Sequence, residues 1–195
     1  MTKDFKIKLP LCISYFIVVF IVPNVGIPVK YDFIFRYLFL VPLILSLVFF
    51  ILFHRMLYQA LLEIKWIKLF LLTSICIASS LVIDTIVSNQ NSLSLSTLSS
   101  NELKKVIIAA TTYGAFLEEM IFRFSLINLA SNKKKIVFLF ISSFLFSIAH
   151  GGNFSIFVLG ILLGVIYIKN SNIWYPILVH IFYNTFAILI YVFFN

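Results

Sequence analysis

The chain has 195 residues, of which 62% are hydrophobic and only 11% are charged, and its formal net charge at pH 7 is +8. Globular proteins average about 25% charged residues, so this composition excludes a soluble domain of any size. The mean hydropathy is +1.10, and successive apolar runs near the roughly 20 residues that cross a bilayer occupy nearly the whole chain. We therefore expect an all-α, polytopic transmembrane helix bundle whose first partner is the lipid bilayer.

A window of about 20 residues gives about seven candidate spans. They are 9–29, 33–53, 66–87, 106–130, 136–149, 154–168 and 173–194. The fifth and sixth spans are short, so tilt or a broken helix is expected there. Residues 1–103 are expected to form a domain of transmembrane helices without recognised motifs, and residues 104–195 a helical core that carries the chemistry.

The first three spans contain structural features rather than chemistry. Pro23, Gly26 and Pro28 end the first span, and Pro42 falls inside the second, where it can kink the helix. His54 and Arg55 follow the second span and are expected in a solvated loop. The two cysteines are embedded in apolar runs and are expected to act as small buried hydrophobes, not as a disulfide or a metal site; they are Cys12 and Cys76.

A Ser- and Asn-rich segment at 88–100 precedes the fourth span, and Ser99 with Glu102 fits a capping box that starts this helix. The fourth span then carries Glu118, Glu119 and Arg123 inside an apolar stretch. Ionisable groups at membrane depth are costly and usually line a protein interior. The three charges therefore mark a candidate functional site.

The last three spans add polar residues at helical spacing. Phe146 stands four residues before His150, and His180 stands four residues before Asn184, so each pair shares a helix face. Small residues four apart permit close helix packing in lipid. Such pairs are Ala110 with Gly114 and Gly160 with Gly164.

Basic residues lie mostly between the apolar runs, so the net charge indicates membrane topology and no nucleic-acid partner is expected. A cytoplasmic N-terminus places the larger basic set inside. That set is Lys3, Lys6, Lys8, Arg55, Lys65, Lys68, Lys133, Lys134, Lys135 and Lys169, against Lys30, Arg36, Lys104 and Lys105 outside. We therefore predict a cytoplasmic N-terminus and an external C-terminus.

Helix geometry separates the two glutamates. At about 100° per residue, Glu119 and Arg123 share a face and can pair, whereas Glu118 points elsewhere and stays free. If the pair only compensates charge, exchanging its two members should partly restore what either single change destroys.

Rise per residue tests whether the polar groups can meet. Glu118 and His150 each lie about 22 Å from the Lys133–Lys135 loop at about 1.5 Å per residue. His180 is only about 16 Å from Lys169, so it is expected to be shallower. We nevertheless expect Glu118, His150, His180 and Asn184 to line one polar cavity, because each is costly to leave in lipid.

These motifs give the chain its resemblance to a known family. EEMIFR (118–123), FSIAH (146–150) and HIFYN (180–184) occur in the order found in the CPBP intramembrane proteases, which include CAAX prenyl proteases and bacteriocin-processing or self-immunity proteins. The resemblance covers roughly 104–194. It implies peptide-bond hydrolysis in the membrane, with a membrane-associated, prenylated or bacteriocin-type peptide as the substrate.

The resemblance also implies roles for individual residues. Glu118 with His150 would activate water, and His180 with Asn184 would stabilise the oxyanion. Glu119 and Arg123 would hold the helix register, with Phe146 as further structural support. Zinc stays open as a cofactor, because Glu118, His150 and His180 could bind it, although a coordinated Glu118 would no longer be the obvious base.

Two other functions remain open from the sequence. One is a non-catalytic self-immunity protein that binds a bacteriocin, for which the 88–100 segment is a candidate surface. The other is a proton-coupled transporter that uses the Glu and His residues as a relay. The order and spacing of the three motifs favour the enzyme.

Overall fold

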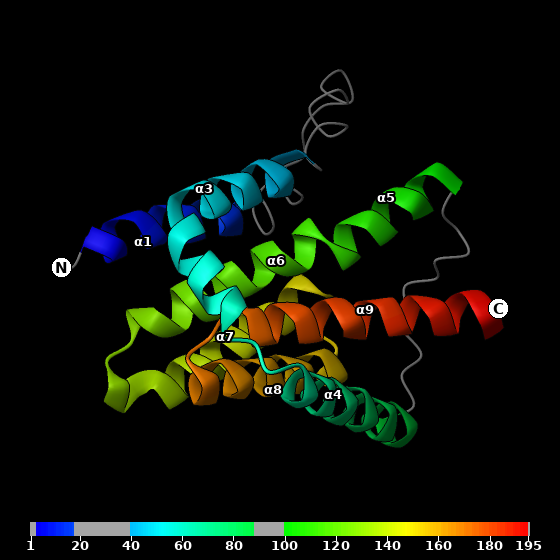
Figure 1. Ribbon diagram of the computed structural model, residues 1–195. Helices are drawn as coiled ribbons and strands as arrows, with labels where there is room; N and C mark the ends of the chain where they lie inside the picture. Colours follow the sequence, from blue (N-terminus) through cyan, green and yellow to red (C-terminus); the bar gives the residue numbers. More distant parts are fainter. Residues whose placement is uncertain (1–2, 18–39, 88–99, 195) are drawn as a thin grey trace.

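The computed structural model describes residues 3–17, 40–87 and 100–194 (Figure 1). All regular structure within these ranges is helical, so the predicted all-α class is confirmed. The α-helices are α1 (Lys3–Phe16), α3 (Leu40–Leu62), α4 (Trp66–Val87), α5 (Ser100–Thr111), α6 (Tyr113–Glu119), α7 (Lys135–Ala149), α8 (Phe154–Asn170) and α9 (Trp174–Phe194). A π-helix η5 (Met120–Leu126) and the short 3₁₀ helices η6 (Ile127–Leu129) and η7 (Asn132–Lys134) connect α6 to α7.

Several sequence predictions lie outside the described residues. These are the end of the first span with its prolines and Gly26, the start of the second span with Lys30 and Arg36, the polar segment before Ser100, and the Ser99 cap.

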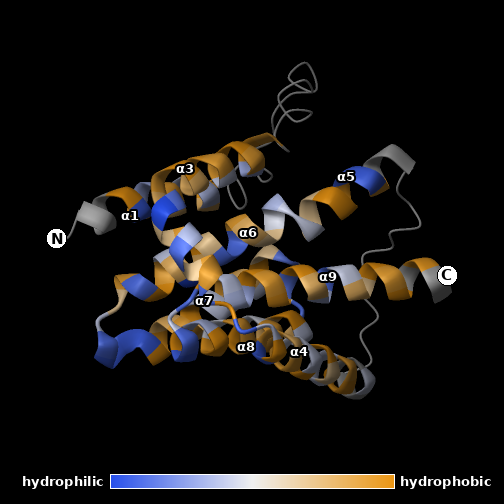
Figure 2. Ribbon diagram, in the orientation of Figure 1, coloured by the Kyte–Doolittle hydropathy of each residue, from blue (hydrophilic) through white to orange (hydrophobic). Residues whose placement is uncertain are grey.

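Most residues of the helices are hydrophobic (Figure 2), and many of the large hydrophobic side chains are exposed, as expected for a lipid-facing surface. Within the described residues, α3 and the 66–83 part of α4 are long and apolar enough to cross a membrane, while α8 and α9 contribute shorter apolar stretches. Ile67 and Phe70 of α4 are exposed despite being large hydrophobes. Together with the composition, these features are those of a membrane-embedded helix bundle.

The second span departs from its predicted boundaries. Its helix α3 continues to Leu62 instead of ending at Phe53, so His54 and Arg55 lie in a helix and not in a loop, although both are exposed. Residues 53–62 include Leu, Met, Gln and Ala, which are good helix formers. Pro42 lies in the first turn of α3, where proline needs no kink.

The fourth span is broken rather than continuous, contrary to the prediction of one helix over 106–130. The chain turns at Thr112, whose φ and ψ are −133° and −104°. A Cβ on Gly114 would lie 2.6 Å from the carbonyl oxygen of Ala109. Gly114 therefore permits the approach of its own chain at the break, and helix–helix packing is not its role there.

Side chains from other helices satisfy the carbonyl groups at this break. The Ser46 hydroxyl donates to the carbonyl of Tyr113 at 3.0 Å, and the Asn184 amide donates to the carbonyl of Ala110 at 2.8 Å. Backbone groups released from a helix inside a membrane need such partners. The break is thus tied to both α3 and α9.

Glycines bring α7 and α8 into close contact, as the small-residue spacing predicted. A Cβ on Gly160 would lie 3.1 Å from the Cα of Ser143, and one on Gly164 would overlap the side chain of Leu139. In Figure 1, α8 lies below α9.

The core extends across both halves of the chain. One apolar cluster joins Cys12 and Tyr15 of α1, Phe49 of α3, Phe122 of η5 and Phe146 of α7. Cys12 and Cys76 are buried free thiols. The two sequence-defined halves therefore differ in their motifs but pack on a shared core.

Candidate active site

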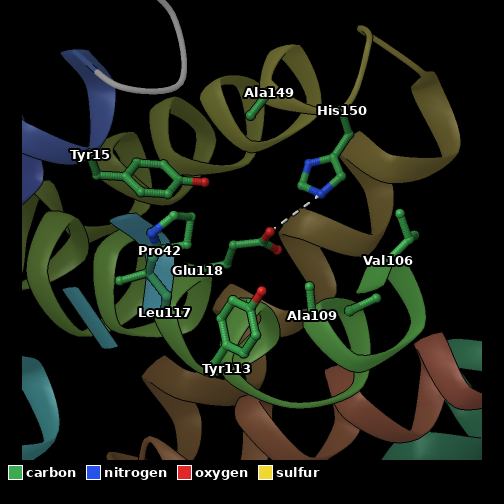
Figure 3. Close-up of a pocket in the computed structure, with 11 residues that line it drawn as sticks. Tyr15, Pro42, Val106, Ala109, Tyr113, Leu117, Glu118, Ala149 and His150 are labelled. Atoms are coloured by element: carbon green, nitrogen blue, oxygen red, sulfur yellow. Dashed lines mark ion pairs between the residues drawn. The ribbon is translucent and has the colours of Figure 1, made fainter. Parts of the chain in front are cut away.

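Glu118 lies in the wall of a cavity of about 390 Å³ (Figure 3). It is one residue from the end of α6, and its side chain is 20% exposed. The cavity is lined by Tyr15, Pro42, Val106, Ala109, Ala110, Tyr113, Gly114, Leu117, Glu118, Ala149 and His150. Most of these side chains are apolar, so a single carboxylate and a single imidazole face a largely hydrophobic space.

Two imidazoles approach the carboxylate of Glu118. Nε2 of His150, which caps the C-terminus of α7, is 3.7 Å from Oε1, and Nε2 of His180 on α9 is 3.7 Å from Oε2. These distances exceed those of direct hydrogen bonds. A water molecule in the cavity can instead contact both Glu118 and His150, because the distance of 3.7 Å between their facing atoms is short enough for one water to bond to both.

The second nitrogen of each ring has a fixed partner. Nδ1 of His150 is 2.8 Å from the carbonyl oxygen of Phe146, and Nδ1 of His180 is 2.9 Å from Oε1 of Glu119. A carbonyl oxygen only accepts, so Nδ1 of His150 carries a proton, and Nδ1 of His180 donates to the carboxylate. In the neutral rings, Nε2 is then the basic nitrogen, and both Nε2 atoms face Glu118.

Glu119 and Arg123 form a fully buried ion pair with an Nη1–Oε1 distance of 3.1 Å. The contact brings the charges together but does not have hydrogen-bond geometry, and Arg123 donates its hydrogen bond from Nη2 to the carbonyl of Gly160 at 3.1 Å. The same Oε1 atom of Glu119 accepts from His180. Glu119 therefore compensates Arg123 and orients His180 at once, a second role that spacing along one helix did not predict.

Phe146 is buried at the centre of the site. Its ring is perpendicular to that of His180 at 5.6 Å, and the guanidinium carbon of Arg123 lies 4.5 Å from its centroid. Its ring centroid is also 4.5 Å from that of His150, whose Nδ1 its carbonyl accepts. Phe146 thus contacts both imidazoles, and its supporting role stays a prediction.

The structure brings together three of the four residues expected to converge. Glu118 and His150 line the cavity, whereas His180 does not line it but approaches Glu118 from α9, with its side chain only 3% exposed. His180 meets Glu118 although its counted distance from Lys169 is the shorter one, because the path counted from Glu118 to Lys133 is not a straight α-helix. Residues 120–134 include π-helical, 3₁₀ and turn segments, which do not advance by the α-helical rise.

Asn184 does not line the cavity. Its amide nitrogen donates to Ala110 at the helix break. Tyr15 and Tyr113 were not predicted, yet their hydroxyls turn toward the cavity beside Glu118 in Figure 3. No sequence pattern marked them, since Tyr15 comes from a distant apolar helix and Tyr113 depends on the break at Thr112.

The donor geometry does not match a metal centre. Within the described parts of the chain, no group of three or more His, Cys, Asp or Glu side chains is arranged to hold a metal ion. The proposed zinc ligands, Glu118, His150 and His180, therefore do not fit zinc in this arrangement, and we derive no catalytic step through a metal.

The fold is that of a membrane-embedded helix bundle, and a comparison with known families indicates the class of protein. Residues 101–186 match the family model described as type II CAAX prenyl endopeptidase Rce1-like. This segment contains all three motifs, and the match confirms the resemblance to CPBP intramembrane proteases and supports an intramembrane endopeptidase in general. Comparisons with curated proteins and with solved structures gave no match.

Proposed function

We propose that this protein hydrolyses a peptide bond in the membrane, with Glu118 as the general base. The observation that carries the proposal is the position of Glu118 in the cavity wall, with one imidazole Nε2 facing each of its oxygens at 3.7 Å. Hydrolysis needs a base within reach of a water molecule, directly or through one further water. Glu118 and His150 offer such a place on the cavity side.

The reaction then takes two steps. Glu118 accepts a proton from water as the water oxygen forms a bond to the scissile carbonyl carbon, which gives a tetrahedral intermediate with a negatively charged oxygen. The C–N bond breaks as the protonated Glu118 returns its proton to the leaving amine, and a carboxylic acid and an amine are released, between which a proton then exchanges. His150 orients the water through Nε2, while its Nδ1–H remains bound to the carbonyl of Phe146.

Residues behind the cavity position the base. His180 is held by Glu119 through Nδ1 and faces Glu118 through Nε2. The cation of Arg123 balances the charge of Glu119, and both side chains are fully buried. Asn184 is assigned a positioning role, because its amide donates to the broken helix that forms another wall of the cavity.

The tyrosines are the donors best placed for the oxyanion. Tyr15 is 5% exposed, and its ring packs edge-on against Phe122 with centroids 5.7 Å apart. A donor held in this way needs no rearrangement when charge develops on the substrate, which is the condition for effective oxyanion stabilisation. We assign this role to Tyr15, with Tyr113 on the other side of Glu118 in Figure 3.

The substrate we propose is a membrane-associated peptide with apolar residues at the cleaved bond, including prenylated C-terminal peptides of the CAAX type. The lining supports this choice because Pro42, Val106, Ala109, Leu117 and Ala149 favour aliphatic side chains. The name of the matching family model points to prenylated substrates as well.

The test uses the full chain purified in detergent and a farnesylated CAAX peptide whose products are identified by mass spectrometry. Glu118→Gln keeps size and should leave the melting temperature unchanged, but activity should fall by a factor on the order of 10² to 10⁴. Glu63→Gln is the matched control. It makes the same chemical change at an exposed glutamate near the end of α3, away from the cavity.

The binding-only alternative predicts a different result. A folded Glu118→Gln protein that retains full cleavage would refute the role of Glu118. If the wild-type protein cleaves neither prenylated nor unprenylated membrane peptides, yet both it and the variant give full protection from a bacteriocin, hydrolysis is not the function.

A further inference from the structure

A second cleft lies between α4 and α8 and shares no lining residue with the active-site cavity. Its volume is about 240 Å³. Its rim carries Lys68 in the first turn of α4, and Lys169 and Asn170 at the end of α8. The rest of its lining is Leu72, Ile75, Cys76, Leu162, Val165 and Ile166.

The cleft is amphipathic along its length. Following α4 from Lys68 to Cys76, and α8 backward from Lys169 to Leu162, the lining changes from cationic to apolar on both helices. This length corresponds to about 12 Å at about 1.5 Å per residue. Such a cleft is complementary to a ligand with an anionic head and a hydrocarbon chain.

Lys68 at the rim packs against an aromatic ring, and no acidic lining residue balances the rim cations. Nζ of Lys68 lies 5.5 Å from the ring centroid of Tyr175, whose hydroxyl accepts a hydrogen bond from the backbone N–H of Lys65 at 2.9 Å. No acidic residue is among the described residues that line the cleft. Trp66 is exposed at the same end of α4, as expected for an aromatic residue at headgroup level.

We propose that this cleft is a binding site for an anionic phospholipid. The phosphate lies between Lys68 and Lys169, and one acyl chain extends over Leu72 and Leu162 toward Cys76. Basic pockets between transmembrane helices recognise anionic headgroups in this way. A bilayer supplies such lipids at high local concentration, so the occupant is a membrane lipid and not a soluble phosphate. The site does not depend on the proposed hydrolysis.

The test measures lipid preference with the delipidated full chain in detergent. Native mass spectrometry would follow titration with dioleoyl phosphatidylglycerol and, separately, dioleoyl phosphatidylcholine. We expect the first lipid to bind more tightly by a factor on the order of tenfold. Lys68→Gln with Lys169→Gln should bring this ratio close to one while leaving the melting temperature in detergent unchanged.

Two further variants make the result specific to the cleft. Lys133→Gln with Lys134→Gln removes the same charge from the exposed segment before α7 and should keep the preference. Val165→Phe fills the cleft without changing charge and should weaken binding of phosphatidylglycerol. The proposal is overturned if the wild type has no preference, if Lys68→Gln with Lys169→Gln retains it, if the control pair loses it equally, or if a folded Val165→Phe protein binds unchanged.

Discussion

His180 lies between the two glutamates, with Nδ1 on Glu119 and Nε2 toward Glu118. The sequence predicted the Glu119–Arg123 contact because residues four apart meet on nearly any helix. It could not predict the contact with His180, which is 61 positions away and depends on how the helices cross. The local part of the site was therefore predictable, and the tertiary part was not.

This arrangement changes the prediction for exchanging the ion pair. Sequence spacing alone favours partial rescue in Glu119→Arg with Arg123→Glu. The structure predicts none, because an arginine at position 119 cannot accept the Nδ1–H of His180 and places a cation beside it. Glu119→Gln with Arg123→Met removes both charges but keeps an acceptor oxygen, so it should retain more cleavage activity than the exchange. The rate of peptide cleavage, compared at equal folded fraction, distinguishes the two double variants. Substantial recovery of cleavage in the exchanged protein would disprove the orienting role of Glu119.

Tyr15 gives a second prediction at this scale. Tyr15→Phe preserves the ring packing on Phe122 and removes only the hydroxyl. We expect kcat to fall by a factor on the order of 10², as for the loss of an oxyanion donor, with little change in KM or in melting temperature. Tyr58→Phe on the exposed face of α3 should leave both constants unchanged. A normal kcat for Tyr15→Phe would remove Tyr15 from the mechanism.

At the scale of helices, composition and hydropathy located α4 and α7–α9 to within a few residues but missed the break at Thr112. Apolar periodicity does not record where a chain leaves the helix inside a membrane, because the residues on both sides stay apolar. Gly114 is the residue that marks the break in the sequence, but its spacing from Ala110 predicted a role in helix–helix packing. Its actual contact is with the carbonyl of Ala109.

The break predicts a difference between two glycine substitutions. Gly114→Ala places a methyl group against backbone, so α5 and α6 must shift, at a cost of about 1–3 kcal/mol. Gly164→Ala meets the end of the flexible Leu139 side chain and should cost less. Thermal unfolding in detergent would measure both. Cleavage should also fall more for Gly114→Ala, because Gly114 and Ala109 line the cavity with Glu118; equal effects of the two substitutions would contradict this account.

At the scale of the whole molecule, the start of α1 and the η7 segment lie at one end of the bundle, and the end of α9 lies at the other (Figure 1). Charge counting assigns the first end to the cytoplasm, because Lys133, Lys134 and Lys135 are there. Reporter fusions after Lys134 and at the C-terminus should therefore report opposite sides, with the first cytoplasmic. A cytoplasmic signal from both fusions would show that the count of spans or their order is wrong.

The π-helix η5 begins immediately after Glu119 and includes Arg123. A π-helical turn accommodates an extra residue relative to an α-helical one. Loss of one residue from 124–126 can therefore be absorbed if this segment relaxes into an α-helix, whereas insertion of one further residue would turn everything before it by about 100° relative to α7. Glu118 and Glu119 would then face away from the two histidines although no motif residue had changed. The spacing between the motifs is therefore itself a functional element, and insertion of one residue at 124–126 would disable the site as fully as removal of Glu118.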